Sequence, residues 1–254
     1  AEQGVADSGD LETDLPNLFL TIGEAAKSSG RPSAVLIDEL QYLSEAEFSA
    51  LIMSMHKVAQ VNLPVILIGA GLPQILALAG ESKSYAERLF RYPKIGELAE
   101  DDARTAIRKP VLEEGAEIEA DAVDDILRIS QRYPYFLQQW GYDAWNQADG
   151  NVITRDDVDA ATEVSIRALD DNFFRVRFDR CTPAERRYMR ALADFGAGSH
   201  RSGDVAALLG VKTQSVGPVR SSLISKGMIY SPQHGDTAFT VPLFDAYMRR
   251  VMTL

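Results

Sequence analysis

The stretch Ala34-Val35-Leu36-Ile37-Asp38-Glu39 decides the fold of this 254-residue chain. Four consecutive aliphatic residues, uninterrupted by a polar one, are typical of a strand that is buried on both faces of a parallel sheet. The run ends in two acids, so the pattern places both carboxylates at the carboxyl end of the strand. A second run of the same character, Val65-Ile66-Leu67-Ile68, is followed by Gly69-Ala70-Gly71.

The residues between these two strands predict a helix that returns the chain across the sheet. Ser44 and Glu47 have the spacing of a capping box, and an apolar stripe at helical spacing extends to about Val61. A strand, a helix and a second strand in this order favour parallel pairing. Helical spacing in residues 15–29 predicts a further amphipathic helix upstream. Residues 1–98 are therefore predicted to form an α/β unit.

The composition changes near residue 98, after a last predicted strand at 93–98. Residues 99–179 have helical periodicity throughout and predict an all-helical unit. We assign three of its apolar positions to the core, Phe136, Leu137 and Trp140, and Trp145 continues the apolar periodicity. Thr182, Pro183 and Glu185 then give a strong helix start, which places the beginning of a third unit, residues 180–254.

The third unit has the element order of a winged helix. Helical patterns cover residues 182–194, 202–209 and 213–226, and Gly210 supplies a turn between the last two. Two short β-like runs follow and predict the hairpin of the wing. The predicted fold class is therefore α/β: a parallel sheet, then an all-helical unit, then a winged helix.

Composition excludes several classes of protein. The chain has 37 acidic and 26 basic residues, a net charge of −11, so any DNA site has to be local. The single Cys181 excludes an internal disulfide and a cysteine-based zinc site, which fits a reducing, cytoplasmic location. No apolar run approaches the roughly 18 residues that a membrane helix needs. We therefore expect a soluble protein with no membrane span.

Asp38 and Glu39 are the candidate catalytic residues. An aliphatic strand that ends in Asp-Glu is the Walker B pattern, in which the first carboxylate binds Mg²⁺ through water and the second orients the attacking water. Asp38 is therefore also the candidate metal ligand. The alternative is a solvated strand end that has no chemical role.

The chain resembles the AAA/STAND class of P-loop ATPases, close to archaeal-type and origin-recognition-like ATP-binding proteins with a C-terminal winged helix. The resemblance spans about residues 30–254. Four segments carry it in this order: AVLIDELQYL (34–43), VILIGAG (65–71), AERLFRYPKIGEL (86–98) and RYPYFLQQWG (132–141). It implies that the parallel sheet is part of a P-loop core and that the all-helical unit is its lid. It also implies that ATP and Mg²⁺ are the ligands, and that the protein is a nucleotide-dependent switch.

The resemblance assigns further residues to the nucleotide. The second strand corresponds to the sensor 1 strand, which usually ends in a polar residue, so the glycines after Ile68 argue against efficient hydrolysis. Arg88 and Arg91 are candidate phosphate contacts, because a planar guanidinium suits phosphate oxygens. The alternative for both is a surface arginine that pairs with Glu81 or Glu87.

Tyr133 and Pro134 look like the lid motif Gly-x-Pro, whose proline packs against adenine in the family. This chain departs from the motif, because Arg132 stands where glycine is usual. Pro134 also fits the first position of an ordinary helix. Arg128 and Arg132 are weaker phosphate candidates.

The phosphate-binding loop itself is missing from these residues. The pattern Gly-x-x-x-x-Gly-Lys-Ser/Thr does not occur, nor does any Gly-Lys pair. The chain begins without methionine and its acidic residues 1–14 have no signal-peptide order, so we expect the loop to precede Ala1 in a longer protein. This chain alone should bind ATP weakly or not at all. A protein that truly lacks the loop would be a scaffold.

The predicted winged helix has two candidate partners. Lys212, Gln214, Arg220 and Lys226 are the candidate DNA-binding residues, with Arg201 and His234 nearby in the pattern. The set is sparse, so contact with a protein partner or self-association is the alternative. A DNA-binding regulator with a degenerate ATPase-like scaffold, and a protein-interaction module without nucleotide, remain alternatives to the ATPase.

Overall fold

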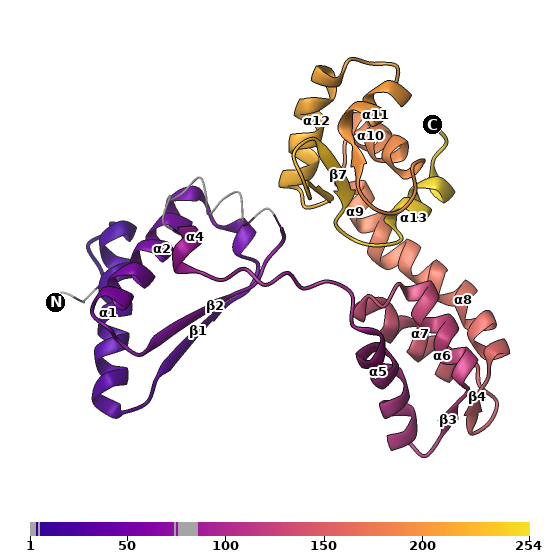
Figure 1. Ribbon diagram of the computed structural model, residues 1–254, viewed down its shortest axis with the longest axis horizontal. Coiled ribbons are helices and arrows are strands. Elements are labelled where there is room, and N and C mark those ends of the chain that lie inside the picture. The colour runs from indigo at the N-terminus through magenta and orange to yellow at the C-terminus, as the bar shows by residue number, and fades with distance from the viewer. Residues whose placement is uncertain (1–3, 5, 74, 76–85) are drawn as a thin grey trace. The chain divides into compact units, whose positions relative to one another are not determined.

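The computed structural model describes residues 4, 6–73, 75 and 86–254 (Figure 1). The chain divides into two compact units, Ala1–Pro93 and Lys94–Leu254. Each unit has its own cluster of buried hydrophobic side chains. The structure therefore holds two independent cores.

Two helices cover the sheet of the N-terminal unit. Helix α1 (Leu11–Ser29) begins where the Asp10 carboxylate caps the N–H of Glu12. Helix α2 (Glu45–Gln60) begins at Ser44, and Ser44 and Glu47 form the predicted capping box. The two helices pack along each other. Their apolar stripes meet the sheet through Phe19, Phe48, Leu51, Ile52, Met55 and Val58.

Strands β1 (Ser33–Ile37) and β2 (Val65–Gly69) pair in parallel, as predicted, with Leu36 opposite Ile68. Only one face of this sheet is covered by described residues. Val35, Ile37, Val65 and Leu67 pack toward the helices. On the other face Leu36, Ile66 and Ile68 are 72%, 56% and 52% exposed. The prediction that both faces are buried is wrong within the described residues, because both helices lie on the same side of the sheet.

The C-terminal unit begins with a helical module, residues 99–169. Four helices form it: α5 (Glu100–Glu113), α6 (Ala120–Ser130), α7 (Pro134–Gln147) and α8 (Arg155–Leu169). The loops between them are tied by a parallel pair of two-residue strands, β3 (Glu117–Ile118) and β4 (Val152–Ile153). Such short strands show no alternation in the sequence, so the pattern did not predict them.

The predicted strand at residues 93–98 is wrong. This segment is an irregular link to α5. Its backbone bonds to a helix end rather than to a strand, since the N–H of Leu98 donates to the carbonyl of Arg132 at 3.1 Å. Ile95 is 91% exposed, so its apolar side chain does not mark a buried strand.

The second part of the C-terminal unit is a module of residues 183–251, hereafter the C-terminal module. It contains α10 (Pro183–Ala193), α11 (Ser202–Leu208), α12 (Thr213–Ser225) and α13 (Phe244–Val251). Strands β5 (His200–Arg201), β6 (Ile229–Tyr230) and β7 (Asp236–Phe239) form a small antiparallel sheet in the order β5-β7-β6. The predicted helices and hairpin are present, and β5 and α13 are additions.

Between the two modules the chain stays helical. A π-helical turn, η2 (Asp170–Phe174), follows α8 directly and leads into α9 (Arg175–Asp179). One continuous set of buried side chains runs from Ala103 in the helical module to Met248 in the C-terminal module. The two modules therefore share a hydrophobic core.

Candidate functional site

Asp38 and Glu39 lie directly after β1, at the carboxyl end of the sheet. Both residues are exposed. One carboxylate oxygen of Asp38 accepts the backbone N–H of Glu39 at 2.8 Å. Glu39 has a left-handed backbone, with φ of 57°, and its neighbour Leu40 begins the 3-10 turn η1 (Leu40–Tyr42). A non-glycine residue in this conformation is strained, and such strain is common where a side chain is held for function.

Gln41 holds the Glu39 side chain in place, and no pattern in the sequence marked it. Its amide nitrogen donates to the Oε2 atom of Glu39. Its amide oxygen accepts the N–H of Leu72, in the loop after β2, at 3.0 Å. Gln41 therefore links the Glu39 carboxylate to the end of the neighbouring strand. The short η1 turn that brings Gln41 there has no periodicity in the sequence, so no pattern marked it.

The end of β2 is closely packed by neighbouring side chains. A Cβ atom at Gly69 would overlap the terminal Cδ1 atom of Leu40. A Cβ atom at Gly71 would overlap the Cδ1 atom of Ile75 and lie 2.6 Å from the amide oxygen of Gln41. A side chain at either position would have to displace these side-chain ends, and with glycine there the strand end supplies only backbone groups to the site.

Arg88 and Arg91 flank the end of α4 (Ala86–Leu89). Both arginines are exposed, and neither has an ion pair with a described residue. The alternative was that these arginines pair with Glu81 or Glu87. Glu81 and the side chain of Glu87 lie outside the described residues, and so does this alternative. The guanidinium groups of Arg88 and Arg91 remain candidates for a phosphate.

Tyr133 and Pro134 begin α7 in the C-terminal unit. Pro134 occupies the first helical position and is exposed, while the half-buried ring of Tyr133 lies 4.9 Å from that of Phe136. Arg132 has φ of 57°, the backbone conformation that glycine adopts most easily. Arg132 thus has a backbone that a glycine would adopt without strain. Arg128 donates to Asp125 at 2.6 Å, which gives it a structural partner.

The four DNA candidates divide into two pairs. Lys212 and Gln214 are exposed at the start of α12. Arg220 is half-buried, where it donates to the hydroxyl of Thr237 at 2.9 Å and to the carbonyl of Asp236 at 2.8 Å. Lys226 donates to Glu185 at 2.7 Å. The structure therefore leaves Lys212 and Gln214 open to solvent, while Arg220 and Lys226 tie α12 to its neighbours.

Glu185 is the buried carboxylate that receives Lys226. Its residue is 3% exposed. Burial alone would raise the pKa of Glu185, but hydrogen bonds from Lys226, Ser222 and the N–H of Thr182 outweigh it and lower the pKa to about 2. The carboxylate therefore remains charged at neutral pH and joins α10 to α12.

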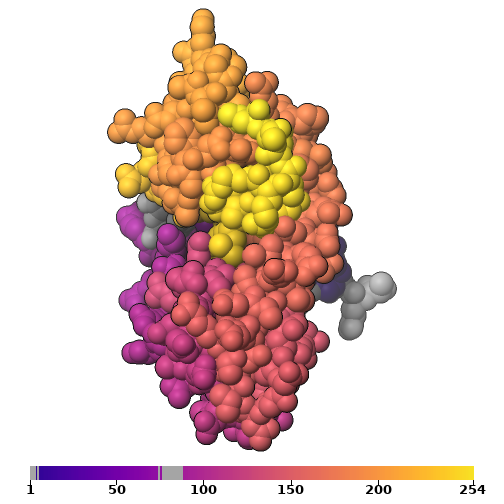
Figure 2. Space-filling model, turned by 90° about the vertical axis from the view of Figure 1, so that its right-hand side faces the viewer, coloured from indigo at the N-terminus to yellow at the C-terminus, as the bar shows by residue number. Residues whose placement is uncertain are grey.

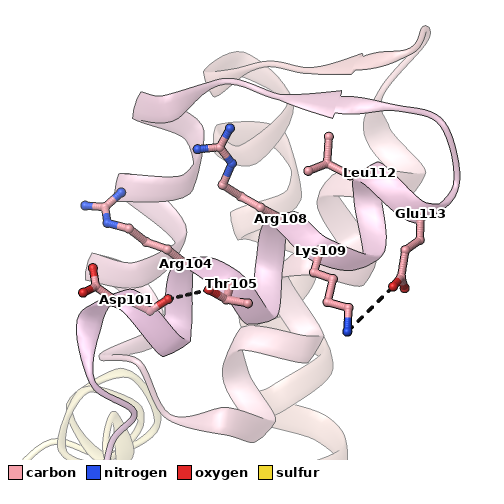
Figure 3. A pocket seen from close by; sticks show the side chains of 7 residues that line it. All are labelled: Asp101, Arg104, Thr105, Arg108, Lys109, Leu112 and Glu113. Carbon is pink, nitrogen blue, oxygen red and sulfur yellow. Dashed lines mark hydrogen bonds and ion pairs between the residues drawn. The ribbon is translucent and has the colours of Figure 1, made fainter.

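A shallow depression runs along the outer face of α5 (Figure 3). All of its lining side chains come from this helix and point to solvent: Asp101, Arg104, Thr105, Arg108, Lys109, Leu112 and Glu113. Arg104 is occupied by Glu100 and Asp124, and Lys109 lies 3.8 Å from Glu113. Most of its cations therefore have acidic partners, and a single helix face does not enclose a ligand.

Among the described residues, no group of three histidine, cysteine or acidic side chains is arranged to hold a metal ion. No helix in the described ranges is long and apolar enough to cross a membrane.

Comparisons with known proteins give a partial family match. A family model described as a domain of unknown function, DUF8462, matches residues 171–248. The match begins within η2 and ends within α13, so it includes α9 and most of the C-terminal module. A search of curated protein sequences gave no match.

Solved structures show the fold. A Walker-type ATPase of Pyrococcus abyssi is similar over 92% of this chain and 68% of its own, at 13% identity and a TM-score of 0.66. A RuvB variant of Thermotoga maritima is similar over 91% of this chain and 74% of its own, at 18% identity and a TM-score of 0.48. Cdc6p from Pyrobaculum aerophilum is similar over 98% of this chain and 72% of its own, at 12% identity and a TM-score of 0.42. The first likeness shows a shared fold, mixed α/β and mostly helical with small parallel sheets, which confirms the predicted fold class.

Proposed function

We propose that this chain is the Walker B and lid portion of an ATP-binding switch. The observation that carries the proposal is the carboxylate pair at the end of β1, where Gln41 links Glu39 to the loop after β2. A structural strand end has no need of an exposed glutamate held by a neighbouring amide in a strained backbone conformation. The likeness to a Walker-type ATPase supports the same function.

The residues present fit Mg²⁺ at one carboxylate. One oxygen of Asp38 accepts the N–H of Glu39, which fixes the side chain and leaves the second oxygen open. Mg²⁺ in nucleotide sites keeps several waters and takes only one or two protein carboxylates. When bound, MgATP would supply a terminal phosphoryl group that water can attack. Glu39 would orient that water and accept its proton.

The remaining candidates would bind the nucleotide from other elements. Tyr133 and Pro134 would contact the adenine, and Arg88 or Arg91 would contact a phosphate. The phosphate-binding loop would come with polypeptide that packs on the open face of the β1–β2 sheet, where aliphatic side chains are exposed. Parallel sheets are normally covered on both faces, so this face supports the presence of such a cover.

The experiment compares Glu39→Gln with Glu45→Gln in the protein that carries the phosphate-binding loop. Glu45 is an exposed carboxylate in the first turn of α2 and serves as the matched control. Glu39→Gln should lower ATP turnover by roughly 10²–10⁴-fold, the usual contribution of a positioned base, and leave ATP binding intact. Turnover at the wild-type rate in Glu39→Gln would reject the proposal.

The surface of α12 favours protein contact over DNA contact for the C-terminal module. Two of the four DNA-binding candidates, Arg220 and Lys226, form hydrogen bonds to other residues of the module. The exposed positions of α12 are otherwise small and uncharged, among them Pro218 and Ser221, and Leu208 and Val211 are exposed just before it. Duplex binding should therefore be absent at low salt. Salt-dependent binding that weakens in Lys212→Ala would instead support the DNA-binding alternative.

A further inference from the structure

The connection between the helical module and the C-terminal module is a helix without a break. Residues 155–179 pass from α8 through η2 into α9, and all of them are described. The backbone stays helical at both joints, with φ and ψ of −67° and −41° at Leu169 and −81° and −43° at Phe174. Flexible links between domains are usually extended and rich in glycine or proline, so this connection has the opposite character.

The π-turn η2 places two aromatic rings at the junction. Phe173 stacks on Tyr135 with centroids 4.9 Å apart, and lies 5.6 Å from Phe136. Phe174 lies 5.9 Å from Phe136. Both aromatic residues of the turn therefore contact α7, which begins at the adenine candidate Pro134, directly after the other candidate, Tyr133.

Phe174 also contacts the other module. Its ring lies 5.5 Å from that of Phe244 and 5.2 Å from that of Tyr247, both in α13. All three side chains are at most 2% exposed. One buried ring thus packs against α7 on one side and α13 on the other, and aromatic pairs of this kind add energy beyond the area they bury.

An ion pair reinforces the same junction. The guanidinium of Arg250 in α13 meets the carboxylate of Asp170 in η2 with both Nε and Nη2, at 3.0 and 2.5 Å. Such two-point contacts fix orientation as well as distance. Figure 2 shows α13, in yellow, lying against the salmon-coloured segment that joins the modules.

We infer that η2 locks the helical module and the C-terminal module into one rigid lever, so that neither moves without the other. The coupling itself does not depend on ATP. Its consequence for nucleotide binding rests on the proposed function: a nucleotide held at Tyr133 and Pro134 would move the C-terminal module together with α5–α8 as one body. The two modules would not hinge against each other.

Spin labels on the full chain test the lever. Glu163→Cys lies in α8, with a side chain 83% exposed, and Lys212→Cys lies at the exposed start of α12. Cys181 is buried, and burial raises the pKa of its thiol, so it should label slowly. The distance between the labels should form one narrow distribution. Phe174→Ala should abolish that single narrow distribution, because the ring that joins α7 to α13 is gone.

Two neighbouring acids give a matched pair in case Phe174→Ala fails to fold. Asp170→Asn removes the charge and one of the two acceptor oxygens that hold Arg250 of α13, and should broaden the distribution. Asp171→Asn changes an exposed acid whose partner, Arg175, is on the same helical rod, and should leave it narrow. Two separate distances in the unsubstituted background, or equal broadening by both acid variants, would overturn the lever. Failure of ATP binding would leave these distances unchanged, so the two proposals fail separately.

Discussion

The two units differ in how completely they bury their apolar residues. In the C-terminal unit one core extends through two modules, and its largest side chains, such as Trp140 and Phe136, are fully buried. In the part of the N-terminal unit that the structure describes, the sheet is covered on one face, and Leu36 on the other face is 72% exposed. The comparison indicates that the C-terminal unit buries its core by itself, whereas one face of the N-terminal sheet is open among the described residues and would be stabilised by a cover.

The largest effect is expected when the two units are produced separately and their unfolding is compared. Residues 94–254 alone should unfold in one cooperative transition, because their core is complete. Residues 1–93 alone should lack such a transition and bind an apolar dye, because a two-stranded sheet with an open face is marginal in water. Calorimetry and dye fluorescence measure both. A cooperative transition in residues 1–93 would show that the open face needs no cover.

A pair of truncations sharpens the comparison side chain by side chain. Phe136→Ala should lower the free energy of unfolding by about 3–5 kcal/mol, the usual cost of a cavity at a buried aromatic. Leu36→Ala should change it by less than about 0.5 kcal/mol, as at other exposed positions. Denaturant titration of the full chain gives both values. A large loss in Leu36→Ala would mean that the face is already covered in solution.

Acid should destabilise the C-terminal module through Glu185. Its pKa is about 2 in the folded chain against an ordinary 4.5. Because the folded pKa is the lower one, the stabilisation is complete above pH 4.5 and is lost as the pH falls toward 2. Glu185→Gln should cost about 1.5–3 kcal/mol at pH 7, as for hydrogen bonds to charged groups. The cost should shrink at pH 3, and Glu163→Gln, an exposed acid, should show neither effect.

Substitution of Arg132 should have the smallest effect on the free energy of unfolding. Its φ of 57° is unfavourable for a residue with a Cβ atom. Arg132→Gly should therefore raise the free energy of unfolding by up to about 1 kcal/mol, the cost of this conformation. Arg132→Ala keeps the Cβ atom and should leave stability unchanged. Equal behaviour of the two variants in denaturant titration would remove backbone strain as the explanation.

The fold could be predicted where local chemistry is strong. The capping boxes at Ser44 and Thr182 are present, because a side chain and a backbone N–H three residues apart meet in any helix start. The strand predicted at residues 93–98 is absent because a strand needs a neighbouring strand to pair with. The backbone of this segment instead bonds to the end of a helix. Phe136, Leu137 and Trp140 are buried as predicted, whereas Trp145, which shares their apolar periodicity, is 42% exposed, because the pattern does not show where the buried face of a helix ends.

The candidate site was predictable only in part, because contiguous motifs are visible in a sequence and contacts between distant residues are not. Asp38 and Glu39 follow a run of aliphatic residues, a contiguous signal. Gln41 acts through Leu72, 31 positions away, and such a contact leaves no trace in one sequence. Arg220 carries the charge expected of a DNA-binding residue, but its half-buried position and its bonds to β7 depend on the tertiary fold.

The close approach of Leu40 to Gly69 limits how the strand end can evolve. A polar residue gained at position 69 would have to displace the terminal Cδ1 atom of Leu40, whose side chain is part of the core of the sheet. Shortening Leu40 instead would leave a hole in that core. The cost of gaining a side chain at this strand end is therefore the cost of repacking Leu40.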